Sequence, residues 1–267
     1  MKRVVAGFVI ALFAQGCVQR LPHGKPPLVE LARGVTLNGF PVTLHLARPL
    51  ALPSRPLLIY ATGDGGWRGK DLDVFRHLAA WGYAVAGFSA PEYVKHLQGL
   101  DQTTTPAMLA SDYAEIIDTA RIELSVPAST AVILVGVSRG AGLSVVAAGQ
   151  ATIQPSLEGV VVVGLTKEEE HVRWRRRRQQ TQLEIYDYLP RLADLPIAVI
   201  QSTRDNYLPA DQARTLFGSD TDRRQFHAID AKNHSFSNAR PLLYDTLRAS
   251  LEWVARVANP RSAEKAR

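Results

Sequence analysis

The sequence predicts an α/β fold, in which a mostly parallel central sheet carries helices on both faces. Short apolar, β-branched runs alternate along the chain with segments of helical periodicity. Most of these runs are continuous rather than alternating, which is typical of strands that are buried on both faces. A chain of 267 residues with 46% hydrophobic residues is also long enough to bury one large core.

Residues 1–17 predict an export signal. The chain starts with a basic dipeptide after Met, and residues 4–14 are almost wholly apolar but too few to span a bilayer as a helix. Cys17, the only cysteine, follows this run, so no internal disulfide can form. We expect a lipoprotein signal with lipid attachment at Cys17, and a protein anchored to a membrane in the periplasm or cell envelope. Because Ala14 stands where such signals carry leucine, an ordinary secretory signal or an uncleaved anchor stays open.

A polar segment separates the signal from the folded domain. Residues 18–30 include Leu-Pro-His-Gly-Lys-Pro-Pro at 21–27, which predicts a tether. The domain is expected at 31–260, with a disordered tail at 261–267. No internal repeat is present.

Within the domain, the expected elements follow one another as strands and helices. Asn38-Gly39 is a strong hairpin-turn signal between alternating segments at 35–37 and 41–47, which predict antiparallel edge strands. Continuous apolar runs and helical periodicity then predict the remaining elements. Strands are expected at 57–61, 83–88, 131–135, 159–164, 195–200 and 225–229, and helices at 71–80, 106–124, 141–148 and 241–258.

One strand-to-helix junction carries a chemical motif. Residues 136–140 read Gly-Val-Ser-Arg-Gly, which fits G-x-S-x-G. In α/β-hydrolases this is the nucleophile elbow, a strained turn that lifts a serine hydroxyl above the sheet. The helix after Ser138 would point its positive end at a developing oxyanion. We therefore expect Ser138 to be a nucleophile on an α/β-hydrolase fold; the alternative is a glycine-rich turn of any α/β fold.

Two later loops supply the partners that such a serine needs. Asp205 lies just beyond one expected strand, and His234 lies in the loop before the last helix, in the chain order of this fold. A base must take the serine proton, and a carboxylate must hold the imidazole in one tautomer. This order predicts a Ser138–Asp205–His234 triad. The residues Glu168–Glu170 are alternative acids, and a turn cap and a solvated loop histidine are the non-catalytic interpretations.

An oxyanion hole would combine two backbone N–H groups. One belongs to Arg139, and the other belongs to the glycine-rich loop after Ala61, where position favours Asp64. This loop lacks the Lys-Ser/Thr ending of a phosphate-binding loop. Since no His-Glu-x-x-His motif or Cys/His cluster is present, we expect no metal and no cofactor.

Three segments together resemble one family. They read GDGGW at 63–67, GVSRGA at 136–141 and EHVRW at 170–174, and they are similar to the VirJ/AcvB family of bacterial virulence proteins in the α/β-hydrolase superfamily. The resemblance runs from about Leu57 to the C-terminal helix. It implies an exported hydrolase with Ser138 as nucleophile, Asp205 as acid and His234 as base. Some family members remove the amino acid from aminoacylated phosphatidylglycerol. The family usually has an aromatic residue where Arg139 stands.

The charge of the chain favours an anionic partner. The net charge is +6, and no nucleic-acid-binding module is recognisable, so we expect a membrane surface or a phospholipid and no nucleic acid. Residues 173–178 read Arg-Trp-Arg-Arg-Arg-Arg and fall between the sixth and seventh expected strands, where this fold often inserts a short cap. Each charge near an anionic surface is worth about 1 kcal/mol. We expect Arg175, Arg176 and Trp67 to bind substrate; a solvated helix face is the alternative for the basic run.

The sequence thus predicts an exported serine hydrolase that cleaves an ester through an acyl-enzyme. By resemblance, the favoured substrate is the aminoacyl ester of lysyl- or alanyl-phosphatidylglycerol. Two alternatives stay open. One is a generic carboxylesterase for small soluble esters, and the other is a non-catalytic envelope accessory that binds secretion partners and carries a vestigial triad.

Overall fold

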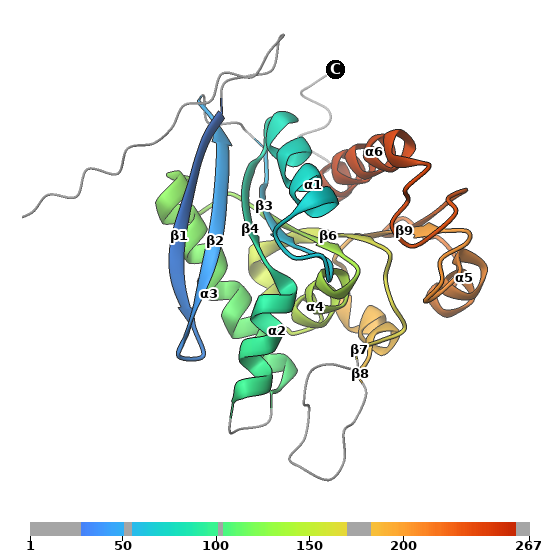
Figure 1. Ribbon diagram of the computed structural model, residues 1–267, viewed down its shortest axis with the longest axis horizontal. Helices are drawn as coiled ribbons and strands as arrows, with labels where there is room; N and C mark the ends of the chain where they lie inside the picture. The colour runs from blue at the N-terminus through green and yellow to red at the C-terminus, as the bar shows by residue number, and fades with distance from the viewer. Residues whose placement is uncertain (1–27, 51–54, 101–103, 170–182, 260–267) are drawn as a thin grey trace, which may run out of the picture.

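The computed structural model describes residues 28–50, 55–100, 104–169 and 183–259. Its main sheet consists of β1 (Leu28–Leu37), β2 (Phe40–Pro49), β3 (Leu57–Ala61), β4 (Ala84–Phe88), β5 (Val132–Val137), β6 (Leu157–Val163), β9 (Ile197–Ser202) and β10 (Arg224–Ile229). These strands lie in the order β1-β2-β4-β3-β5-β6-β9-β10 (Figure 1). β2 pairs antiparallel with β1 and β4, whereas every other neighbouring pair is parallel. The predicted mostly parallel sheet is confirmed.

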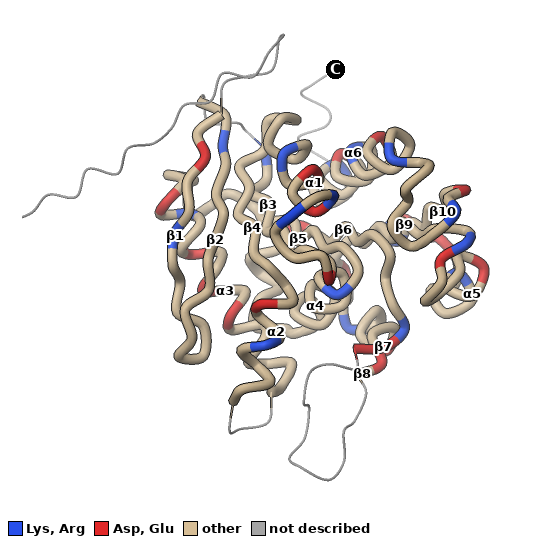
Figure 2. Tube along the Cα trace, in the orientation of Figure 1, with Lys and Arg blue, Asp and Glu red and all other residues tan. Residues whose placement is uncertain are grey.

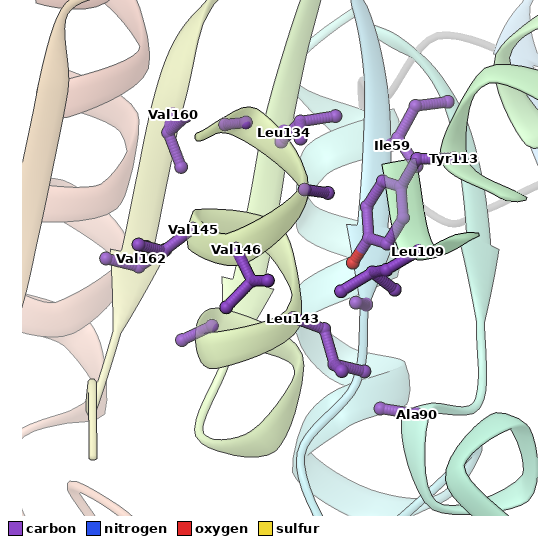
Figure 3. Packing of buried hydrophobic residues seen from close by; sticks show 14 of the residues in the cluster. Ile59, Ala90, Leu109, Tyr113, Leu134, Leu143, Val145, Val146, Val160 and Val162 are labelled. Atoms are coloured by element: carbon purple, nitrogen blue, oxygen red, sulfur yellow. The ribbon is translucent and has the colours of Figure 1, made fainter. Parts of the chain in front are cut away.

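Helices cover both faces of this sheet (Figure 1). One face carries α1 (Gly69–Ala80) and α6 (Arg240–Ala258), and the other carries α2 (Ala90–Gly99), α3 (Pro106–Leu124), α4 (Arg139–Ala148) and α5 (Ala210–Phe217). Alternate residues of a strand point to opposite faces. Val160 and Val162 of β6 accordingly pack under α4, where Figure 3 shows them beside Val145 and Val146, while Val161 joins the core under α6.

An insertion separates β6 from β9, the sixth and seventh strands of the sheet. It contains the two-stranded pair β7 (Glu168–Glu169) and β8 (Leu183–Glu184), followed by a 3-10 helix over Ile185–Leu192. Ile185 packs against Gly142 of α4, so this helix lies over the same face as α4. The insertion expected at this place is therefore present. The basic run with Arg175 and Arg176 lies outside the described residues.

The sheet begins earlier than the expected domain boundary. β1 starts at Leu28, and its register pairs Leu28 with Pro49 and Glu30 with Ala47, so residues 28–30 belong to the sheet rather than to the tether expected at 18–30. β2 has the same length as β1, and each residue of β1 pairs with one of β2. Cys17 and the rest of the expected signal lie outside the described residues.

Two helices were not predicted from the sequence. α2 spans 10 residues and α5 spans 8, and such short segments show few turns of apolar periodicity. Within the described ranges, no helix is long and apolar enough to cross a membrane.

Candidate active site

The turn between β5 and α4 holds Ser138 in a strained conformation. Its backbone has φ 53° and ψ −118°, which a residue with a Cβ rarely adopts. The N–H of Ser138 donates to the carbonyl of Val163 at 2.8 Å, and the carbonyl of Ser138 accepts from the N–H of Ala141 at 2.8 Å. The strain is thus held by hydrogen bonds on both sides of the residue, as the G-x-S-x-G motif leads one to expect.

The two glycines of the motif lie where no side chain fits. A Cβ on Gly136 would come within 2.3 Å of the Gly140 carbonyl oxygen, and a Cβ on Gly140 within 2.2 Å of the Ala61 carbonyl oxygen. The N–H of Gly140 also donates to the carbonyl of Thr62 at 3.1 Å. The elbow is therefore locked directly onto the start of the glycine-rich loop that follows β3.

A buried carboxylate orients the predicted base. Asp205 follows β9 and His234 follows β10, and Asp205 Oδ2 lies 2.6 Å from His234 Nδ1. The Asp205 side chain has no exposed surface. Its Oδ1 accepts from the N–H groups of Tyr207 and Leu208, and its Oδ2 also accepts from Gln201 Nε2. Because a carboxylate only accepts, Nδ1 carries the proton and Nε2 is left as the basic nitrogen.

His234 lies against the strand end that also anchors Ser138. A Cβ on Gly164 would lie 2.8 Å from His234 Cε1, and Gly164 directly follows Val163, whose carbonyl accepts from Ser138. His234 Nε2 is buried and has no hydrogen-bond partner among the described residues. No hydrogen bond joins it to the Ser138 hydroxyl in this structure. Such bonds often form only when substrate is bound.

The alternative acids occupy other positions. Glu168 lies 3.3 Å from Lys167, and Glu169 lies 3.7 Å from the Arg139 guanidinium. Asp205 is thus the residue of this group that bonds to His234. Glu170 lies outside the described residues.

The predicted oxyanion hole uses the backbone N–H groups of Asp64 and Arg139. No described residue accepts a hydrogen bond from the N–H of Asp64 or of Arg139. The N–H of Gly63 is engaged, because it donates to Asp71 Oδ1 at 2.8 Å. A Cβ on Gly63 would lie 3.3 Å from Ser138 Cβ, so this loop lies directly beside the elbow. Of the three N–H groups, that of Gly63 is therefore engaged, and those of Asp64 and Arg139 have no acceptor among the described residues.

Asp71 is a residue of the site that sequence reasoning missed. It lies in the first turn of α1 with 1% of its surface exposed. Its Oδ1 also accepts from the Tyr60 hydroxyl at 3.3 Å, while its Oδ2 has no partner within the described part of the chain. Burial raises the pKa of the Asp71 carboxyl. Asp71 and His234 line the same small cavity of about 20 Å³. Acidic residues are common in the first turn of a helix, so the sequence gives no sign that Asp71 has a special role. Its hydrogen bond to Gly63 of the GDGGW loop distinguishes it.

Trp67 packs against the sheet and α1. Its ring stacks on His45 with centroids 3.8 Å apart and meets Phe75 edge-on at 4.8 Å. It lines a cavity of about 600 Å³ between the β1–β2 hairpin and α1, and neither Ser138 nor His234 lines that cavity. Trp67 thus lines a cavity other than the one that His234 lines, and its role in binding substrate stays a prediction. Among the residues of the described ranges, no cluster of His, Cys, Asp and Glu is arranged to hold a metal ion.

Solved structures share this fold. Est1E from Butyrivibrio proteoclasticus matches with a TM-score of 0.62 and 14% identity, over 84% of this chain and 99% of that one. A dienelactone hydrolase from Anabaena variabilis matches with a TM-score of 0.60 and 18% identity, over 84% and 95%. A cold-adapted esterase from an Arctic intertidal metagenomic library matches with a TM-score of 0.58 and 13% identity, over 86% and 94%.

The sequence comparisons give a sharper result. No curated protein matches the chain. The family described as "Bacterial virulence protein (VirJ)" matches residues 56–201, which is more than half of the chain and includes the GDGGW loop and the elbow. This chain therefore belongs to the VirJ family of bacterial virulence proteins, and it has the α/β-hydrolase fold.

Proposed function

We propose that this chain is a serine hydrolase that cleaves an ester through an acyl-enzyme on Ser138. One observation carries the proposal. The strained Ser138 and His234 meet the same end of β6: the N–H of Ser138 donates to the Val163 carbonyl, and the imidazole lies against Gly164. The Nδ1 of this imidazole is held by the buried Asp205, and its Nε2 is buried without a partner in the described ranges. A basic nitrogen and a lifted hydroxyl at one strand end are the parts that nucleophilic catalysis requires.

The first half-reaction forms the acyl-enzyme. His234 Nε2 takes the proton of the Ser138 hydroxyl as Oγ attacks the ester carbonyl carbon, and Asp205 stabilises the resulting imidazolium. The N–H groups of Asp64 and Arg139 hold the oxyanion of the tetrahedral intermediate. The C–O bond to the alcohol then breaks, and the imidazolium gives its proton to the departing alkoxide.

The second half-reaction releases the acid. A water molecule gives a proton to His234 Nε2 as its oxygen attacks the acyl carbon. The same N–H groups hold the second oxyanion. The bond to Ser138 Oγ then breaks, and Oγ recovers the proton from the imidazolium. Removing one such N–H donor typically lowers kcat by about 10²–10³-fold, so this pair contributes a large share of catalysis.

The substrate that we propose is the aminoacyl ester of aminoacyl-phosphatidylglycerol, of the lysyl or alanyl type. Membership in the VirJ family supports it, because the resemblance to that family implies this reaction for some of its members. The net charge of +6 suits an anionic membrane surface. With an export signal that ends at Cys17, the enzyme would be anchored in the cell envelope beside its lipid substrate.

Fluorophosphonate labelling of the purified protein tests the nucleophile. We expect a single labelled peptide that contains Ser138, and no label in the Ser138→Ala variant. A label on another residue, or none, contradicts the mechanism. If Ser138→Ala also supports the full cellular function, the accessory interpretation with a vestigial triad replaces it.

A generic carboxylesterase is the second candidate, because the fold is shared with Est1E and with the cold-adapted esterase. Turnover of lysyl-phosphatidylglycerol in vesicles, compared with that of short p-nitrophenyl esters, separates the two. A higher kcat/KM on the lipid supports the aminoacyl-lipid hydrolase. A kcat/KM that is high only on the soluble esters supports the carboxylesterase.

The basic run is tested separately by flotation with anionic vesicles. Changing Arg175–Arg178 to Gln should weaken binding of the lipid-free protein if these side chains contact head groups. Unchanged binding contradicts their proposed role at the membrane.

A further inference from the structure

The side chain of Arg139 joins three segments around Ser138. Its Nε donates to Asp64 Oδ1 in the loop after β3, and its Nη1 lies 3.7 Å from Glu169 Oε1 of β7. The Arg139 side chain is only 11% exposed. Figure 2 shows the β7–β8 pair in the red of acidic residues, close to α4, which Arg139 begins.

Arg139 and Asp64, which form the shortest of these contacts, are also the two residues whose backbone N–H groups hold the oxyanion in the proposed mechanism. Arg139 is the first residue of α4. The N–H of Gly63 donates to Asp71, so the proposed donor of this loop is the N–H of the next residue, Asp64. Arg139 and Asp64 lie 75 positions apart in the chain. Their side chains therefore connect two N–H donors that are distant in sequence, in addition to the backbone bond from Gly140 to Thr62.

An oxyanion hole depends on the spacing between its donors, which must each reach about 2.7–3.1 Å from one oxygen. The Arg139 donor is set by α4. The Asp64 donor lies in a loop of glycines, and the Asp64 side chain has no hydrogen bond or ion pair except that with Arg139 among the described residues. The backbone hydrogen bond from Gly140 to Thr62 joins the start of this loop to α4, and the ion pair is the side-chain contact that ties the Asp64 donor itself to Arg139.

We propose that Arg139 and Asp64 form a positioning pair for the oxyanion hole, in which the side-chain ion pair sets the distance between the two backbone donors. This inference rests on the proposed function. Glu169 extends the pair to β7, so the start of the insertion is connected to the same donors. Arg139 suits this role better than Lys would, because its planar fork can bond two carboxylates at once.

A double-mutant cycle tests the pair, because substitution leaves the backbone N–H groups in place. We expect Arg139→Gln and Asp64→Asn each to lower kcat on p-nitrophenyl acetate about 10-fold, with little change in KM. This loss is smaller than the loss of kcat on removing an oxyanion-hole donor, because both N–H groups remain. The double variant should be no worse than the poorer single one. The exchanged pair, Asp64→Arg with Arg139→Asp, should recover part of the loss.

Arg33 and Glu123 provide a matched control. Arg33 Nε lies 2.7 Å from Glu123 Oε2, and this pair joins β1 to α3, elements that carry none of the proposed catalytic groups. Arg33→Gln and Glu123→Gln should leave kcat within about twofold, because this part-buried pair joins elements away from the proposed catalytic groups. Additive effects at Arg139 and Asp64, or an unchanged kcat in either single variant, would overturn the positioning role.

Amide hydrogen exchange gives a readout without turnover. In Arg139→Gln, the loop at residues 62–67 should exchange faster than in the wild type, and in Arg33→Gln it should not. An unchanged exchange rate in this loop overturns the positioning role but leaves the proposed function standing. A wild-type protein that neither labels at Ser138 nor turns over any ester overturns the proposed function, and the positioning role with it.

Discussion

The two sides of the proposed Ser138 site are held in different ways. On the acid–base side, the Asp205 carboxylate accepts hydrogen bonds from His234 Nδ1, Gln201 Nε2 and two backbone N–H groups. On the oxyanion side, the loop after β3 is held by carboxylates, with Asp71 bonded to the N–H of Gly63 and Asp64 paired with Arg139.

This difference separates two kinds of sensitivity. Asp205 has a donor on each oxygen, so its charge is satisfied within the fold. Asp71 has one buried oxygen without a partner in the described residues, and burial raises its pKa. On the acid–base side, we expect kcat to fall when a catalytic group is replaced. On the oxyanion side, we expect kcat to fall when a contact that positions the loop is lost.

The largest expected effect lies on the acid–base side. Asp205→Asn should lower kcat about 10⁴-fold, because an amide cannot stabilise the imidazolium and favours the wrong tautomer. Steady-state kinetics on p-nitrophenyl acetate measures this. The exposed Asp230, which pairs with Arg204, offers the matched Asp230→Asn control. Comparable losses in the two variants would show that Asp205 has no special role.

The junction between the two sides gives the next effect. Gly140→Ala forces a Cβ to within 2.2 Å of the Ala61 carbonyl oxygen, so the elbow must separate from the loop. We expect a loss of about 3 kcal/mol in the free energy of unfolding, at the upper end for overpacking. Urea unfolding measures it, with Gly99→Ala as the control, since a Cβ there meets nothing within 4 Å. Equal stability of the two variants would contradict the tight junction.

Asp71 tests the oxyanion side by itself. Asp71→Ala removes the acceptor of the Gly63 N–H, and we expect kcat to fall about 30-fold with little change in KM, less than for loss of a whole donor. Asp71→Asn should lower kcat less than Asp71→Ala does, because the amide oxygen can still accept from the Gly63 N–H. Asp73→Asn, on the same helix and 45% exposed, is the control. Equal kcat in the Ala and Asn variants would argue against this role.

Asp112 is a buried carboxyl outside the site, and its replacement has the smallest expected effect, a change in stability that depends on pH. Burial raises the pKa of Asp112 to about 6, although the Tyr93 hydroxyl and the Asn38 amide both donate to its Oδ2 at 2.5 Å. The folded state therefore binds this proton more tightly than the unfolded state. Its contribution to stability is full below pH 3.8, the unfolded value, and is lost as the pH rises through about 6.

The Asp112→Asn variant checks this sign. Relative to wild type, it should gain on the order of 1–2 kcal/mol in the free energy of unfolding at pH 7.5, and the difference should shrink towards pH 4. Urea titrations at several pH values measure it. An unchanged kcat is expected, because no described contact joins Asp112 to Ser138. A difference independent of pH would contradict the raised pKa.

Much of the scaffold is readable from local patterns. The continuous apolar run at 57–61 became β3, and the runs around 131–135 and 159–164 became β5 and β6, because strands buried on both faces accept only such residues. The turn at Asn38-Gly39 joins β1 to β2 as expected. Short helices such as α5 carry too few turns for a clear period, so they were missed.

The sequence by itself determined the sheet, the elbow and the order of Ser138, Asp205 and His234, since each depends on the composition of a few neighbouring residues and on the chain order of the fold. Only the tertiary structure decided that Trp67 packs against His45, that Asp71 holds the loop beside Ser138, and that Arg139 pairs with Asp64. These contacts join residues from separate elements. Which side chains meet there follows from how the layers pack, and local pattern carries no record of that packing.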